Sequence, residues 1–131
     1  MVVIPGSAPD KPSEERGPTF TGRVWADPVL PGTDGVAITS IFFEPSAHTF
    51  WHYHEAGQIL HVVAGIGLVR AEGGEAEVIR AGDVVWTPPG ERHWHGATPR
   101  SFVTHLSISL GTTVWGEEVA DGGYPESDLD L

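Results

Sequence analysis

Short runs in which apolar and polar residues alternate follow one another along most of the chain, with turn residues between them. A period of two is typical of strands that bury one face, and no segment keeps the 3.6-residue spacing of an amphipathic helix. The pattern predicts strands at Thr19–Trp25, Val36–Glu44, Thr49–His54, Gln58–Ala64, Gly67–Ala71, Ala76–Ile79, Asp83–Thr87, His93–Gly96 and Phe102–Leu110. About nine short strands at this spacing predict an all-β sandwich or a small barrel.

The two ends differ from this pattern. Residues 1–18 are rich in proline and predict an irregular arm, whereas residues 117–131 predict an acidic, solvated tail. The middle, residues 19–116, is therefore expected to form one domain, in keeping with the usual size of roughly 100–150 residues. A turn is predicted at 31–35, where Pro, Gly and Asp cluster.

Composition mainly excludes classes of function. The 131 residues carry a net charge of −11, which argues against nucleic acids and anionic membranes as partners, since both need basic surface. The chain has no Cys, which excludes disulfides, iron–sulfur clusters, Cys-ligated zinc and a Cys nucleophile. No signal peptide or long apolar span stands out, so a cytoplasmic location is expected.

Histidines carry the candidate chemistry. Six of the seven lie between positions 48 and 95. His52 and His54 are two residues apart, as are His93 and His95, so each pair shares one face of its strand. A barrel interior would bring these strands together, and an imidazole cluster without Cys favours a divalent metal site.

The histidines belong to two longer motifs, His52-x-His54-x3-Gln58-x6-Gly65 and Gly82-x5-Pro88-x-Gly90-x2-His93. Both resemble motifs of the cupin family, which has Glu where this chain has Gln58. The stretches at 82–86, 93–96 and 104–106 are similar to the manganese-dependent cupin hydroxynitrile lyases, and small cupins also include aromatic polyketide cyclases. The resemblance implies an antiparallel β-sandwich closed into a jelly-roll barrel.

The resemblance also implies the metal ligands. They are His52, His54, Gln58 and His93, which would hold one divalent ion: zinc or manganese, with iron as a further candidate. Gln58 could instead hydrogen-bond beside the ion, and a cupin without metal is a second alternative. Three imidazoles and an amide are all neutral, so the ion would keep its full formal charge and polarise a substrate oxygen strongly.

Proton transfer is assigned to a second pair of histidines. His95 shares its strand face with His93, and His105 lies on a strand that lines the pocket in the resembled lyases, so each is a candidate base. A purely structural role for each stays open. By the same resemblance, the substrate wall comprises Thr39, Ile41, Phe43, Val103 and Ser109. Such a mainly apolar wall favours a hydrophobic, carbonyl-bearing small molecule.

These features favour a metal-dependent enzyme in which the ion activates a carbonyl and a pocket histidine moves a proton. We expect a polyketide cyclase that closes a ring by an aldol-type reaction, with hydroxynitrile lyase-like carbon–carbon cleavage as the alternative. A cupin dioxygenase and a non-catalytic ligand-binding cupin are further alternatives. Many small cupins pair, so a homodimer is left open.

The remaining histidines and aromatics are expected to be structural. His48 is predicted to be solvated at a turn, and His61 to lie behind the sheet, out of phase with Gln58. The aromatic strand residues are predicted to pack inside the sandwich. They are Phe42, Phe43, Phe50, Trp51, Trp86, Trp94 and Phe102.

Overall fold

The computed structural model describes residues 1–6, 10–128 and 131, so positions 7–9 of the predicted arm and 129–130 of the predicted tail lie outside the described residues. The strands are β1 Glu14–Arg16, β2 Phe20–Thr21, β3 Val24–Thr33, β4 Val36–Phe43, β5 His48–Thr49, β6 His52–His54, β7 Gln58–Ala71, β8 Glu77–Arg80, β9 Val84–Thr87, β10 His93–Ala97, β11 Val103–Leu110 and β12 Thr113–Trp115. No helix among the described residues is long and apolar enough to cross a membrane.

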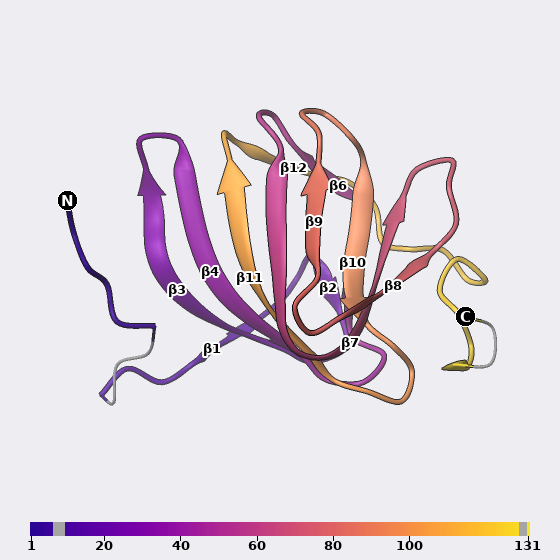
Figure 1. The fold of residues 1–131 in the computed structure, drawn as a ribbon. Helices are drawn as coiled ribbons and strands as arrows, with labels where there is room; N and C mark the ends of the chain where they lie inside the picture. Colours follow the sequence, from indigo (N-terminus) through magenta and orange to yellow (C-terminus); the bar gives the residue numbers. More distant parts are fainter. Residues whose placement is uncertain (7–9, 129–130) are drawn as a thin grey trace.

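The strands form two antiparallel sheets that share β7, and together they curve into a barrel (Figure 1). Sheet A contains β1, β3, β4, β11, β9 and the first part of β7. Sheet B contains the second part of β7 with β2, β5, β6, β8, β10 and β12. This arrangement confirms the predicted all-β, antiparallel jelly-roll architecture.

Strand β7 passes from one sheet to the other at Gly65. The strand predictions at 58–64 and 67–71 are therefore one bent strand rather than two. Gly65 has a φ of 81°, and a Cβ at this position would overlap the carbonyl oxygen of Phe102. Only glycine therefore fits the bend at which β7 turns against β11.

The N-terminal strands also differ from the prediction. The expected strand at 19–25 is interrupted at Gly22, which has a φ of 79°, and β3 then runs on to Thr33. The predicted turn therefore reduces to Asp34 and Gly35, both with positive φ. β3 tolerates Pro28 because β1 pairs only with Val24–Ala26, so the rest of β3 is an edge that needs no donor on that side.

Short strands also form near both ends of the chain. β1 lies within the predicted arm, and β12, which was not predicted, pairs with β6. The domain boundaries at 18 and 117 stay a prediction. Within the predicted tail, the Tyr124 hydroxyl donates a 2.5 Å hydrogen bond to the carbonyl of Ala97, so part of this segment packs against β10 rather than being solvated.

The core lies between the sheets and includes the fully buried Phe43, Val24 and Val103. The prediction that the aromatic residues pack inside holds for Phe43. Trp94 is fully buried, but on the face of β10 opposite to His93 and His95, where it packs against His48 and Tyr124. The prediction is wrong for Phe42, Trp86 and Phe102, which lie on the outside of the barrel. The outer apolar face consists of Phe42, Val63, Val84, Trp86 and Phe102, which are 36–65% exposed.

Candidate metal centre and cavity

Four imidazoles meet inside the barrel because two strands pair. β6 carries His52 and His54, β10 carries His93 and His95, and His93 lies opposite His52 in the ladder. Each of the four is at most 3% exposed. The His52 ring lies 4.3 Å from that of His93, 5.0 Å from that of His54 and 5.3 Å from that of His95, measured between centroids. The two-residue spacing that the sequence displays thus produces one cluster.

Backbone carbonyls fix the tautomers of two of these rings. The Nδ1 atom of His52 lies 2.9 Å from the carbonyl oxygen of Phe50, and that of His93 lies 2.9 Å from the carbonyl oxygen of Glu91. A carbonyl oxygen can only accept, so each Nδ1 must carry the hydrogen. In the neutral rings the lone pair is therefore on Nε2, the arrangement that metal-ligating histidines adopt.

Other nitrogen and oxygen atoms in the cluster have no suitable hydrogen-bond partner in the described part of the chain. The Nε2 atoms of His54 and His95 are buried, and neither has a hydrogen-bond partner among the described residues. The Gln58 amide nitrogen donates to Ser107 and Ser109, so its Oε1 atom faces His93 Nε2 at 3.1 Å, and both atoms offer lone pairs. A cation bound by both atoms satisfies this arrangement, so the donor set fits a metal ion.

Burial keeps the cluster neutral. Desolvation lowers the pKa of His52, His93 and His95, and it lowers the pKa of His54 to about 4. Repulsion from neighbouring imidazoles adds to the effect at His52, His54 and His95. Uncharged imidazoles at neutral pH are the form that binds a metal or accepts a proton.

The structure places the expected metal ligands and one expected base in the same cluster. His52, His93 and His95 each offer a ligand atom within 4.8 Å of the other two. His54 and Gln58 line a cavity that His52 and His95 also line. The expectation from the sequence put His95 among the bases, so the geometry adds it to the residues that could hold an ion.

His105 lies behind His95 rather than on the cavity wall. Its Nε2 atom is 3.1 Å from His95 Nδ1, and its ring packs against Phe43. It is fully buried, and burial lowers its pKa to about 4. Any action of His105 on a ligand in the cavity therefore passes through His95.

The cluster opens into a cavity of about 320 Å³. Of the residues predicted for the substrate wall, Thr39, Ile41 and Ser109 line it, whereas Phe43 and Val103 are fully buried behind it. Sequence reasoning missed other lining residues, which come from segments near the two ends of the chain or from neighbouring strands. They are Arg16, Gly17, Thr19, Phe20, Ala37, Thr49, Ser107, Thr113 and Trp115. Strand parity could have found Ser107, which shares its face with Ser109.

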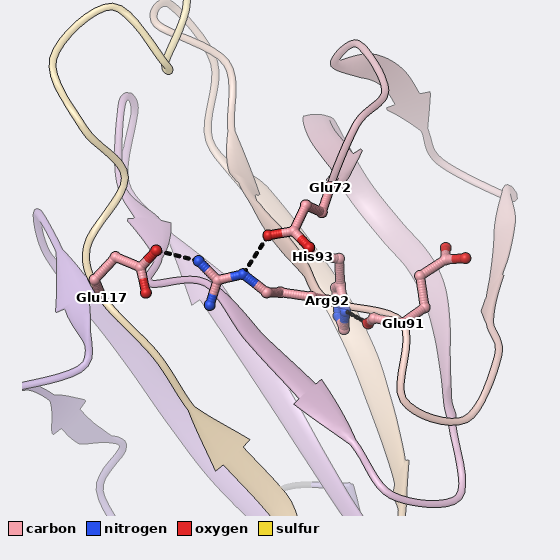
Figure 2. A network of polar contacts seen from close by, with 5 residues as sticks. All are labelled: Glu72, Glu91, Arg92, His93 and Glu117. Carbon is pink, nitrogen blue, oxygen red and sulfur yellow. Dashed lines mark hydrogen bonds and ion pairs between the residues drawn. The ribbon is translucent and has the colours of Figure 1, made fainter.

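An exposed ionic network holds the start of β10 in place. Figure 2 shows the Arg92 guanidinium between the carboxylates of Glu72 and Glu117, while the adjacent His93 bonds to the Glu91 carbonyl. The Arg92 Nε atom lies 2.7 Å from Glu72, and the guanidinium covers the Trp51 ring at 5.2 Å. Arg92 thereby links the turn after β7, the beginning of β10 and the segment after β12.

The two histidines outside the cluster have different environments. His61 is exposed on the outside of the barrel, as predicted. The prediction of a solvated His48 is wrong, because the ring is 6% exposed and stacks on Tyr124 at 4.3 Å. No local pattern signals this contact, since Tyr124 lies 76 positions further along the chain.

Known proteins share sequence or fold with this chain. The chain is 49% identical over 117 residues to an (R)-mandelonitrile lyase of Granulicella tundricola, a match that covers 83% of this chain and 89% of that protein. A cupin-like protein of Thermotoga maritima is 34% identical with a TM-score of 0.81, covering 89% and 95% of the two chains. The polyketide cyclase RemF of Streptomyces resistomycificus has a TM-score of 0.70 at 21% identity, covering 85% and 81%, which shows a shared fold alone.

The family assignment rests on both sequence and structure. The cupin domain model matches residues 40–106, which contain the histidine pairs of β6 and β10. The matched range also contains the whole of β7 with its bend at Gly65. The chain belongs to the cupin family.

Proposed function

We propose that the protein is a metal-dependent carbon–carbon lyase that acts on a small hydrophobic cyanohydrin or related carbonyl compound. The observation that carries this proposal is a buried cluster of neutral imidazoles, with unpartnered Nε2 atoms, beside a partly apolar cavity. The 49% identical relative named (R)-mandelonitrile lyase supports the same class of reaction.

The expected ligands of a divalent ion are His52, His54, Gln58 and His93. His95 has a ligand atom within 4.8 Å of those of His52 and His93, but in this proposal its Nε2 atom stays unligated for proton transfer. Zinc and manganese are the preferred ions, with iron as a further candidate. A bound ion would supply Lewis-acid polarisation of a substrate oxygen. Because no Asp or Glu is among the described residues that line the cavity, no carboxylate offsets the charge of that ion.

Proton transfer falls to His95. Its Nε2 atom is buried without a partner, and its lowered pKa keeps it ready to accept a proton. In cyanohydrin cleavage the substrate hydroxyl gives its proton to His95 Nε2 while the bond between the hydroxyl-bearing carbon and the nitrile carbon breaks. The aldehyde forms, and the departing cyanide takes the proton from His95. His105 orients His95 through the Nε2–Nδ1 hydrogen bond.

Two observations rank the lyase above the polyketide cyclase that the sequence favoured. The relative named as a lyase is 49% identical, whereas the cyclase RemF is 21% identical and supports only the fold. The cavity of about 320 Å³ is at the lower end of the roughly 300–1,000 Å³ of small-molecule sites, which suits a single aromatic ring better than a polyketide.

The test combines elemental analysis with turnover. Metal-replete protein should carry one divalent ion and release benzaldehyde from mandelonitrile without consuming oxygen. His52→Ala should lose the metal, and His95→Gln should lose most of the turnover, whereas His61→Ala on the outer face should retain both. A protein that binds no metal, or that cleaves no cyanohydrin when loaded, would contradict the proposal. Oxygen consumption would favour the dioxygenase, and ring closure would favour the cyclase.

A further inference from the structure

Arg16 gives the cavity a charge that the rest of its lining lacks. Among the described residues that line the cavity, Arg16 is the one Lys, Arg, Asp or Glu. The chain as a whole carries −11. An acidic protein thus encloses a cavity whose fixed charge is positive, and electrostatic focusing in such a cavity favours anions.

The Arg16 guanidinium has one ion-pair partner among the described residues, and that contact is long and exposed. Its nearest carboxylate is Glu14, at 4.0 Å, and the Glu14 side chain is about half exposed. No hydrogen bond of the Arg16 guanidinium to another described residue is found. By contrast, Arg92 is held by two close carboxylates. Exposed ion pairs at such a distance contribute little, so Arg16 is free to exchange Glu14 for a ligand.

The position of Arg16 is fixed by the backbone. β1 pairs with β3 so that Arg16 lies opposite Val24, which is fully buried in the core. The Arg16 side chain is 35% exposed, whereas the imidazole cluster is almost fully buried. Arg16 therefore lies on the solvent side of the cavity, and the histidines lie at its base.

An aromatic wall also borders this cavity. Phe20 and Trp115 both line it, with ring centroids 5.5 Å apart, and Trp115 lies 4.6 Å from His52. A flat ring seated against these residues would have one substituent near the imidazoles and could direct another towards Arg16. Guanidinium groups pair with carboxylates through two parallel hydrogen bonds.

We propose that Arg16 binds an anionic group of the substrate, so that the cavity takes an aromatic carbonyl compound that carries a carboxylate remote from the reacting carbon. The carbonyl part of this inference rests on the proposed function. The anionic part rests on Arg16 and on the lack of acidic side chains among the described residues of the lining.

The test measures binding rather than turnover, by titration calorimetry with benzaldehyde and 4-formylbenzoate. These probes differ only in the carboxylate. The native protein should bind 4-formylbenzoate about tenfold more tightly, as expected for one charge-assisted pair. Arg16→Gln should abolish this preference, and Arg16→Lys should retain part of it. Arg23→Gln is the matched control, since Arg23 is 61% exposed and does not line the cavity.

Repeating the titrations on metal-free protein separates Arg16 from any bound ion, and the preference should persist there. Equal affinity for the two probes, no measurable binding of 4-formylbenzoate, or a preference that survives Arg16→Gln would each overturn the proposal. Failure to cleave mandelonitrile would contradict the proposed lyase but would leave the measured preference for the anion intact, so the two failures are distinguishable.

Discussion

Acid should destabilise the metal-free protein through His105. This imidazole is fully buried, and burial lowers its pKa from 6.5 to about 4. In the unfolded chain the same ring titrates near its usual value. Between these two values the unfolded state binds more protons than the folded state, so stability is retained above pH 6.5 and is lost as the pH falls towards 4.

The size of this effect follows from the two pKa values. A gap between 6.5 and about 4, at about 1.36 kcal/mol per pH unit, makes the full loss about 3 kcal/mol below pH 4. At pH 5 the loss from His105 alone is about 2 kcal/mol, since the folded form is still almost entirely neutral there. Total stabilities of roughly 5–15 kcal/mol make such a change easy to measure.

Urea unfolding at pH 7.5 and pH 5, in the presence of a chelator, measures the effect. The drop in the free energy of unfolding between the two pH values should be about 2 kcal/mol smaller in His105→Leu than in the native protein. His61→Leu is the control, because this imidazole is exposed on the outer face. The substitution at His105 changes the absolute stability as well, so only the pH-dependent part is compared. An equal drop in all three proteins would refute the reasoning.

Three further predictions concern packing and assembly. Gly96→Ala should lower the free energy of unfolding by roughly 3 kcal/mol in urea, because the added Cβ would overlap the Ala47 carbonyl oxygen; an unchanged midpoint would contradict this. Tyr124→Phe should cost about 1 kcal/mol in the same assay, since the hydrogen bond to Ala97 is lost; a free energy of unfolding equal to that of the native protein would argue against it. A homodimer stays a prediction and would bury the outer apolar face, so Trp86→Asp should produce monomers in light scattering. A native protein that is already monomeric would exclude it.

Much of the candidate site was predictable because strand parity is a local property. His52 and His54 are two residues apart and so share one face, and the same holds for His93 and His95, whatever the rest of the chain does. The structure adds the pairing of β6 with β10, which brings the two faces together. The resemblance to the cupin family implied a ligand set shared by the two strands, but neither it nor the spacing gave the pairing itself.

The contacts that were missed depend on segments far apart in the sequence. Arg16 and Trp115 reach the same cavity from near opposite ends of the chain, and Tyr124 covers His48. No periodic pattern connects such positions. Trp86 was wrongly predicted to pack inside for a different reason. Hydrophobic alternation does not reveal whether the outer side of a sheet faces solvent or protein.

The continuity of β7 has a consequence for how the protein unfolds. The first part of this strand pairs with β9 and β11, and the second part pairs with β8 and β10. Gly65 pairs in one sheet and Ile66 in the other, so displacing either part of β7 moves the bend that the other part depends on, and partial opening of one sheet alone is disfavoured. Amide protons at Leu60 and Leu68, on either side of the bend, should therefore exchange through one shared global opening rather than through two separate cooperative units.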